Sequence, residues 1–245
     1  MATHARYTRI LVDEFDFSTD SNSLSVAIAN NVIDVTCFQA TAVEQLTGYS
    51  GGIISHNGYY IPGAAEGELE KEMYDRRETS GTVAALFGTN TAACPAYVIP
   101  SAQAETWEVG APIDGALTLT GSWTGGSGIR RGLRVWTGTF SATGAQATPG
   151  YIDLGAQATA GGYAYLFVQT ITGGATDAII LLESDDNTDF SSAATEATFT
   201  FSAVGASAAT LSGTIDRYIR LNCTDLGTAT SFVVVCVACV SGITY

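Results

Sequence analysis

The sequence is poor in positive charge and in histidine, and each shortage excludes a class of function. Lysine and arginine together number 10 against 24 aspartates and glutamates, and the formal net charge is −14. Tight binding of nucleic acid requires clustered lysine and arginine on the phosphates, so we exclude that function. The two histidines, His4 and His56, are too few for a histidine-based zinc centre or a serine–histidine–aspartate triad.

Charge of either sign is scarce. Charged residues make up 14% of the chain, against about 25% in ordinary soluble domains. Serine, threonine, alanine and glycine take their place. A surface with so little charge favours association, so we expect much of it to be covered by neighbouring subunits.

Long apolar runs are absent as well. The most apolar segment, residues 231–243, is β-branched and too short to span a bilayer, so it predicts a buried strand and no membrane partner. The first 15 residues show no secretory signal. The five cysteines have irregular spacing, which favours reduced thiols in a cytoplasm. Cys236 and Cys239 fall within the apolar strand, on opposite faces, and are interpreted as core residues rather than a redox or zinc pair.

Strand patterns dominate what is present, with turn residues between them at hairpin-like intervals. This pattern predicts an all-β fold with sandwich-like lobes. The glycine-rich stretch Gly121–Gly128 divides the chain into an N-terminal β-domain, residues 1–125, and a C-terminal β-sandwich domain, residues 126–245. The predicted strands are Tyr7–Val12, Ser23–Ile28, Val32–Phe38, Gly52–Ile61, Ala96–Ile99, Thr106–Val109, Ala116–Trp123, Leu133–Phe140, Tyr163–Thr170, Ala178–Glu183, Ala197–Phe201, Thr214–Asn222 and Ser231–Val240.

Helical patterns are few. Residues 66–80 have acids in the first turn, apolar residues at helical spacing and arginines later, which predicts one principal helix that Gly81 ends. A shorter helical turn is expected at Thr41–Leu46. Asn57-Gly58 predicts a two-residue hairpin turn, which would leave His56 exposed at its tip.

The acidic clusters have a structural interpretation. Glu183, Asp185, Asp186 and Asp189 lack the turn glycine and closing glutamate of a calcium loop, so Asp185-Asp186-Asn187 predicts an Asx-type turn that closes a hairpin. No phosphate loop, nucleotide fingerprint or nucleophile elbow is present. The three tryptophans, Trp107, Trp123 and Trp136, are not placed together by any pattern. We therefore expect no catalytic residue, no metal and no cofactor, and the protein is interpreted as not an enzyme.

The order of segments resembles the major tail tube proteins of long-tailed, siphovirus-like bacteriophages. The resemblance rests on the acidic opening "RILVDEFDFSTDSNSLSV", on "VIDVTCFQATAVEQLTG", and on "ISHNGYYIPGAAEGELEKEM", an aromatic strand that leads into an acidic helix. Two hairpin-like segments of the second half, from Tyr163 to Phe190 and from Gly213 to Val240, extend it. Cys37 and the stretch "NGYYIPG" depart from the family pattern. The departure would change the tip of the hairpin predicted at Asn57-Gly58.

The resemblance implies a virion structural protein that forms stacked rings and a hollow conduit for DNA ejection. Its partners would be further copies of itself and the tail tip and tail terminator proteins, in a tail assembled in the host cytoplasm. DNA would pass the lumen without specific binding, since acids repel phosphates. The lumen-facing candidates are Asp13, Glu14, Asp16, Asp20, Glu66, Glu68, Glu70 and Glu72.

Two questions stay open on the sequence. In simple tail tubes, six chains with about one sandwich each close into a ring. A chain with two lobes would supply six lobes from three copies. We therefore expect three chains per ring rather than six. A capsid decoration or tail-fibre module, and a carbohydrate-binding β-sandwich, are the alternative functions. The first would be a discrete trimer or monomer, and the second would need a cluster of aromatic residues.

Overall fold

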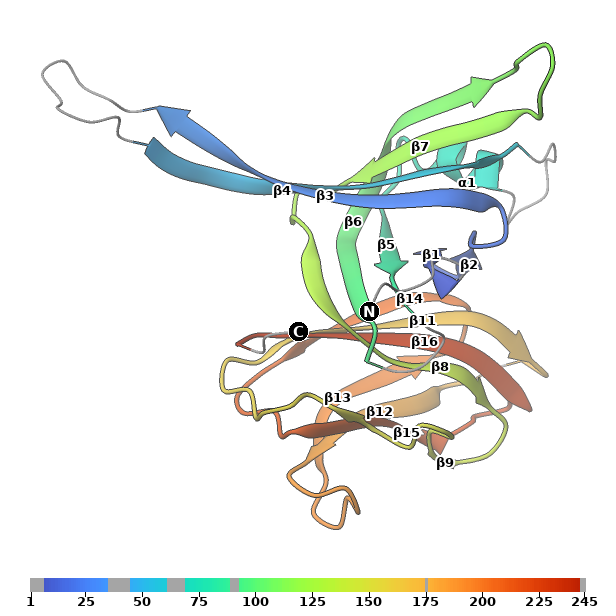
Figure 1. The fold of residues 1–245 in the computed structure, drawn as a ribbon. Coiled ribbons are helices and arrows are strands. Elements are labelled where there is room, and N and C mark those ends of the chain that lie inside the picture. The colour runs from blue at the N-terminus through green and yellow to red at the C-terminus, as the bar shows by residue number, and fades with distance from the viewer. Residues whose placement is uncertain (1–6, 35–44, 61–68, 89–92, 175, 243–245) are drawn as a thin grey trace, which may run out of the picture. The chain divides into compact units, whose positions relative to one another are not determined.

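The computed structural model describes residues 7–34, 45–60, 69–88, 93–174 and 176–242, and omits the side chains of 29–34 and 45–50. The chain forms two compact units. The sandwich unit comprises Met1–Asp16, Leu86–Tyr97 and Arg131–Tyr245, and the ribbon unit comprises Phe17–Ala85 and Val98–Arg130. The chain therefore crosses between the units four times (Figure 1).

The sandwich unit contains two antiparallel sheets. Within this unit the strands of the first sheet, which is part of an 11-stranded sheet, follow the order β14-β11-β16-β8, and the second sheet has β10-β15-β12-β13, with β9 paired to β15. A short hairpin, β1–β2, belongs to the same unit. The strands are β1 Arg9–Val12, β2 Phe15–Asp16, β8 Arg130–Phe140, β9 Gly144–Ala145, β10 Ile152–Asp153, β11 Gly162–Thr172, β12 Ala178–Asp185, β13 Ala194–Phe201, β14 Gly205–Leu211, β15 Tyr218–Asp225 and β16 Ser231–Val240.

The core of the sandwich unit lies between these two sheets. Alternate residues of β11, β12, β15 and β16 point inward, as the period of two in a strand requires. Four aromatic residues form a chain through it: the ring centroids of Trp136 and Phe140 are 4.7 Å apart, those of Phe140 and Phe232 5.8 Å, and those of Phe201 and Phe232 5.1 Å. This packing of two sheet faces is a β-sandwich.

The ribbon unit is built on one sheet and a helix. Strands β3 (Ser21–Asp34), β4 (Gln45–Tyr59), β7 (Thr118–Thr124) and β6 (Pro95–Gly110) pair in that order, and all three pairings are antiparallel. β5 (Gly81–Leu86) pairs with β6. Helix α1 (Leu69–Asp75) buries Leu69 and Met73, the two apolar residues of its predicted inner face.

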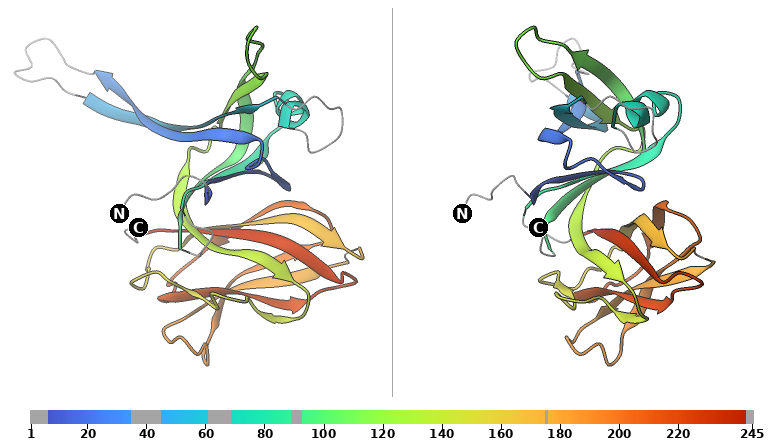
Figure 2. Two further views of the ribbon diagram at one scale, coloured as in Figure 1. Left: turned by 45° about the vertical axis from the view of Figure 1, so that its right-hand side comes forward. Right: turned by 90° about the vertical axis from the view of Figure 1, so that its right-hand side faces the viewer.

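The far part of the β3–β4 hairpin is a two-stranded ribbon. β7 pairs with β4 only along Ile53–Tyr59, whereas β3 follows β4 back to Gln45. Figures 1 and 2 show this ribbon extending beyond the other strands of its unit. A two-stranded hairpin with no third strand is marginally stable in water, so the ribbon is the least supported element of the described chain.

The all-β fold with one short helix is confirmed, while several boundaries differ from those predicted. Two predicted strands merge into β3, although residues 35–38 of the second lie outside the described residues, and two others merge into β6. The short strands β2, β9 and β10 were not predicted, and neither were β5 and β14. The helix ends at Asp75, and Gly81 begins β5 rather than ending the helix. Of the predicted turn at 41–46, residues 41–44 lie outside the described residues, and Gln45 and Leu46 belong to β4. Among the described residues, no helix has the length and apolar character of a membrane span.

The predicted Asn57-Gly58 hairpin turn is wrong. Both residues lie inside β4, where Asn57 pairs with Ser23 and Gly58 pairs with Ser21. Neither has the positive φ that the predicted turn requires. Gly58 instead permits a close approach of two backbones, because a Cβ atom there would lie 2.0 Å from the carbonyl oxygen of Asp20.

Candidate functional site

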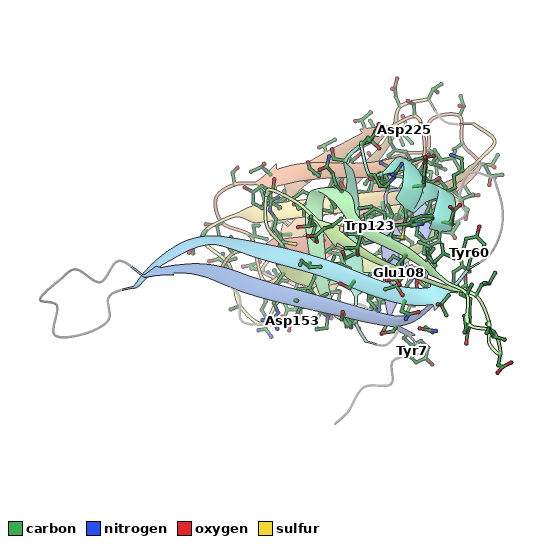
Figure 3. All side chains as sticks on the ribbon, turned by 90° about the horizontal axis from the view of Figure 1, so that it is seen from above. Tyr7, Tyr60, Glu108, Trp123, Asp153 and Asp225 are labelled. Atoms are coloured by element: carbon green, nitrogen blue, oxygen red, sulfur yellow. The ribbon has the colours of Figure 1, made fainter. Side chains whose placement is uncertain are left out.

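The sheet of the ribbon unit has one face of small polar side chains, here called the hydroxyl face. Ten residues of β3, β4, β6 and β7 share it by strand alternation and register. The hydroxyls of Thr106 and Ser122 are 2.7 Å apart on this face, and Glu108 is its only charged member. Figure 3 labels Glu108 beside the neighbouring strand β7. Its polar members are Ser23, Ser25, Ser55, Asn57, Thr106, Glu108, Thr118, Thr120, Ser122 and Thr124. The same register places the exposed side chains of Ile53 and Tyr59 on this face, opposite Thr124 and Thr118.

The opposite face of this sheet carries the helix. A Cβ atom added to Gly121 would lie 1.9 Å from Cε of Met73, so the glycine provides the space into which the helix packs. His56 lies beside them and is 2% exposed, which corrects the prediction of an exposed histidine. Its Nδ1 accepts a hydrogen bond from Nε1 of Trp123 at 3.3 Å.

Burial makes His56 a neutral residue. Loss of water around the imidazole lowers the pKa of His56 to about 4. Nε2 is buried and has no hydrogen-bond partner in the described part of the chain. The residue therefore packs as part of the helix–sheet contact, and no catalytic base follows from it.

The outer edge of the sheet is strand β3. In the described chain β3 pairs only with β4, so one side of a 14-residue strand keeps unpaired backbone groups. Such an edge is a template for pairing with another strand. The ribbon and this edge together form the longest open pairing surface among the described elements.

Apolar residues gather on the surface of the ribbon unit. Eleven large apolar side chains are exposed in the described chain, and eight of them lie in this unit. Tyr74 and Trp107 touch with ring centroids 6.2 Å apart, and Ile113 and Leu117 share the tip of the β6–β7 hairpin. Grouped apolar exposure of this kind marks surfaces that bind other proteins. The eight are Ile28, Ile53, Tyr59, Tyr74, Trp107, Val109, Ile113 and Leu117.

The predicted acidic residues fall on both units. Asp13 and Glu14 form the turn between β1 and β2, and Asp16 is paired with Arg9, all in the sandwich unit. Asp20 is in the ribbon unit, and its backbone carbonyl accepts a hydrogen bond from the amide of Tyr59 at 2.9 Å.

The predicted helix acids differ from one another. Glu70 is half-buried, whereas Glu72 is 6% exposed and lies 4.0 Å from the guanidinium of Arg76. Glu66 and Glu68 lie outside the described residues. Glu105 and Glu108 are exposed acids of β6 that the sequence interpretation missed. Both acids are within two residues of Trp107 in a segment of β6 with a strand-like sequence, and this pattern could have identified them as exposed acids of a strand.

The second acidic cluster is a turn, as predicted. Oδ1 of Asp185 accepts a hydrogen bond from the amide of Asn187 at 2.9 Å, and Oδ2 accepts one from the amide of Ser192 at 2.9 Å. These bonds lower the pKa of Asp185, first through Asn187. A hydrogen bond with Asp185 raises the pKa of Asp186. The turn connects β12 and β13, which pair antiparallel. Within the described ranges, no group of three or more potential ligand residues could hold a metal ion.

The cysteines of the described chain are core residues. Cys94, Cys223, Cys236 and Cys239 are buried thiols that form no disulfide with one another, which confirms the interpretation of the last two as core residues. Burial raises the pKa of the Cys236 thiol. Cys37 lies outside the described residues.

No protein-family model matches this chain, and no curated protein does. Among solved structures the chain is similar, at 12% identity and a TM-score of 0.40, to a chain of the virion of a native gene transfer agent particle, over 52% of this chain and 97% of that one. It is similar to a chain of the anti-feeding prophage baseplate at 11% identity and a TM-score of 0.34, over 50% and 90%. Similarity to the SPP1 Dit protein, a phage hub protein, covers 94% and 98% at 11% identity and a TM-score of 0.31.

Proposed function

We propose that this protein is a structural virion subunit, a phage tail tube protein that assembles through its ribbon unit into stacked rings. The observation that carries the proposal is the β3–β4 ribbon, whose far part has no third strand in the described chain. A ribbon of this length gains a stable environment when it lies against another copy. The resemblance of the sequence to tail tube proteins supports the same assembly.

The edge of β3 supplies a means of closing a ring. A strand edge on one copy that pairs with a different surface of the next copy is a head-to-tail interface, which produces rings or open filaments. The exposed apolar groups at Tyr74–Trp107 and at the β6–β7 tip, Ile113–Leu117, would then be covered by neighbours. Low charge over the rest of the chain agrees with such burial.

The hydroxyl face is the proposed wall of the lumen. It contains no lysine or arginine, and Glu108 with the nearby Glu105 adds negative charge. Carboxylates repel phosphate groups, and neutral hydroxyls without lysine or arginine beside them provide no charge that would hold the DNA backbone, so DNA would pass without tight binding. Of the earlier candidates, Asp13, Glu14, Asp16, Asp20, Glu66 and Glu68 remain proposed as lumen or rim residues. Glu70 and Glu72 belong to the helix, which packs on the opposite face of the sheet, so they would not line this wall.

The two units do not share a topology, which removes the reason to expect three chains per ring. One is a two-sheet sandwich and the other a single sheet with a helix. We therefore propose one ring-forming unit per chain and six chains per ring. The tube-forming role expected for residues 1–125 is proposed for the ribbon unit, Phe17–Ala85 and Val98–Arg130, and the accessory role expected for residues 126–245 is proposed for the sandwich unit, which also includes Met1–Asp16 and Leu86–Tyr97. The partners we propose are further copies of the chain and the tail tip and terminator proteins, and the location is the virion tail after assembly in the host cytoplasm.

Negative-stain electron microscopy of the purified protein tests this function. We expect rings or hollow tubes for the full chain at high concentration. A variant in which residues 31–48 are replaced by Asn-Gly should remain a folded monomer, because it lacks the ribbon but keeps the pairing of β4 with β7. Far-ultraviolet circular dichroism checks its folding. A full chain that stays a discrete monomer or trimer at every concentration contradicts the proposal and favours a decoration or fibre module.

A further inference from the structure

We propose that the outer face of the second sheet of the sandwich unit binds a neutral saccharide, on a patch centred on Tyr151 and the Asp153–Arg217 ion pair. This inference is independent of the proposed tube. The aromatic–arginine patch consists of Tyr151, Asp153, Glu183, Phe190, Arg217, Tyr218, Arg220 and Asn222.

Three aromatic rings gather at this patch from different segments. The ring centroid of Tyr151, just before β10, is 5.4 Å from that of Tyr218 on β15 and 6.2 Å from that of Phe190 in the β12–β13 loop. Phe190 has a φ of 52°, a conformation that is uncommon for a residue with a side chain. The chain thus holds the Phe190 ring against Tyr151 in a backbone conformation that carries strain.

Two arginines extend the patch. The guanidinium of Arg220 lies 4.1 Å from the centroid of Phe190, and that of Arg217 lies 5.1 Å from the centroid of Tyr218. Arg220 donates to Glu183 at 2.9 Å, and Asn222 donates to the other oxygen of Glu183 at 2.7 Å. Register places these groups on one face, since Glu183 of β12 is opposite Arg220 of β15. They are cross-strand neighbours that hold one another in place.

A buried glutamine anchors the loop that leads to Tyr151. Gln146 is 4% exposed, its Oε1 accepts from the amide of Leu221 at 2.8 Å, and its Nε2 donates to the carbonyl of Pro149 at 2.7 Å. Tyr151 is therefore positioned before any ligand arrives. Groups that are already ordered lose little conformational entropy on binding.

The groups that remain open to solvent suit a sugar ring. Tyr151 is 37% exposed over the buried Phe190, so it offers an apolar surface to the C–H groups of a pyranose. Arg217 holds Asp153 through two bonds of 2.7 Å, from Nε to Oδ1 and from Nη2 to Oδ2. Nη1 of Arg217 has no partner in the described chain, and Oδ2 of Asp153 keeps acceptor capacity. Adjacent donors and acceptors in one plane match the vicinal hydroxyls of a sugar.

The local charge favours a neutral ligand. Two arginines pair with two carboxylates in this patch, and Asp185, which is opposite Tyr218 in the register, adds negative charge, as do Asp189 and Asp216 next to Phe190 and Arg217. The patch therefore does not attract anionic ligands. Aromatic, amide and paired charged groups are what recognise an uncharged polyhydroxyl compound, and together with the surrounding acids they favour that ligand over an anionic one.

Saturation-transfer NMR and calorimetry with maltotriose, cellotriose, mannotriose and the trimer of N-acetylglucosamine test the site. We expect the full chain to bind at least one with a millimolar or tighter Kd, and Tyr151→Ala to weaken that binding about tenfold. Arg217→Lys should weaken it as well, because a lysine cannot make the planar double bond to Asp153. Near-ultraviolet circular dichroism verifies the fold of each variant.

Tyr163→Ala is the matched control, because Tyr163 is 36% exposed and belongs to the first sheet of the same unit. It should bind as the full chain does. The proposal is overturned if none of the four sugars binds at about 10 mM, or if both tyrosine variants lose binding equally. It is also overturned if Tyr151→Ala, unlike Tyr163→Ala, abolishes association of copies, because the patch would then be a subunit contact.

Discussion

The two units use apolar residues in different ways. The sandwich unit places them between two sheets, and among its described residues only Tyr151, Tyr163 and Val204 are large apolar side chains that are exposed. The ribbon unit has one sheet and a seven-residue helix, and eight of its large apolar side chains remain exposed. A single sheet covered by so short a helix cannot bury both of its faces. The sandwich unit thus buries its apolar residues within itself, whereas the ribbon unit keeps apolar surface that neighbouring molecules could cover.

The largest expected effect is in the core of the sandwich unit. Phe232→Ala removes the ring that contacts both Phe140 and Phe201, and it should lower the free energy of unfolding by about 3–5 kcal/mol. Hydrogen exchange measured on peptides in urea should show the loss in β8, β11 and β16 and spare β4 and β7. An equal loss of exchange protection in both units would show that they unfold together, and would contradict the view that the two units differ in stability.

A smaller effect is expected where the helix meets the sheet. Gly121→Ala introduces a methyl group into the space of the Met73 side chain, which is fully buried, so it should cost about 1–3 kcal/mol. The methyl group meets the flexible end of Met73. Gly121→Ala should therefore lower the free energy of unfolding by less when Met73→Ala is already present. Urea unfolding of the four chains of this double-mutant cycle measures the coupling. Additive costs would mean that the two residues do not share this space.

The ribbon unit should also weaken with acid. The pKa of His56 is about 4 in the folded chain and about 6.5 in the unfolded chain. The unfolded chain therefore binds more protons, and stability that is present above pH 6.5 is lost as the pH falls. Between pH 7.5 and 5 the loss should be about 2 kcal/mol. Unfolding of His56→Gln over the same range should show a flatter dependence, and an equal slope would assign the loss to other groups.

The smallest effect is expected on the outer side of the helix. Lys71 and Asp75 form an exposed ion pair four residues apart, and Lys71→Ala should cost less than about 0.5 kcal/mol. Thermal unfolding at low and high salt checks this value. A decrease in the free energy of unfolding of more than about 1 kcal/mol would show that the exposed side of the helix contributes more to the stability of the ribbon unit than expected for a surface ion pair.

Sequence patterns predicted the sandwich unit better than the ribbon unit. The β-branched and alternating residues of β8, β11, β12 and β16 have local signals, and so does the Asx turn at Asp185. β14 was missed because its "GASAATL" sequence has no β-branched or aromatic strand signal before its last residues.

The candidate site was harder to predict, because its residues are set by contacts distant in the sequence. Gly58 is required by the backbone of Asp20 and Gly121 by the side chain of Met73, and neither requirement can be read from neighbouring residues. His56 was expected to be exposed because the Asn-Gly signal next to it is usually a turn. The Tyr151–Tyr218 contact likewise joins segments that no periodicity relates.

The position of β16 sets the order in which the protein can be completed during synthesis. This strand, Ser231–Val240, lies between β11 and β8, so the first sheet of the sandwich unit has a gap until the ribosome has delivered residue 240. The long ribbon, by contrast, is translated within the first 59 residues. Nascent chains on neighbouring ribosomes would therefore display their pairing edges before their stable cores exist, a period in which mispairing between chains is most damaging.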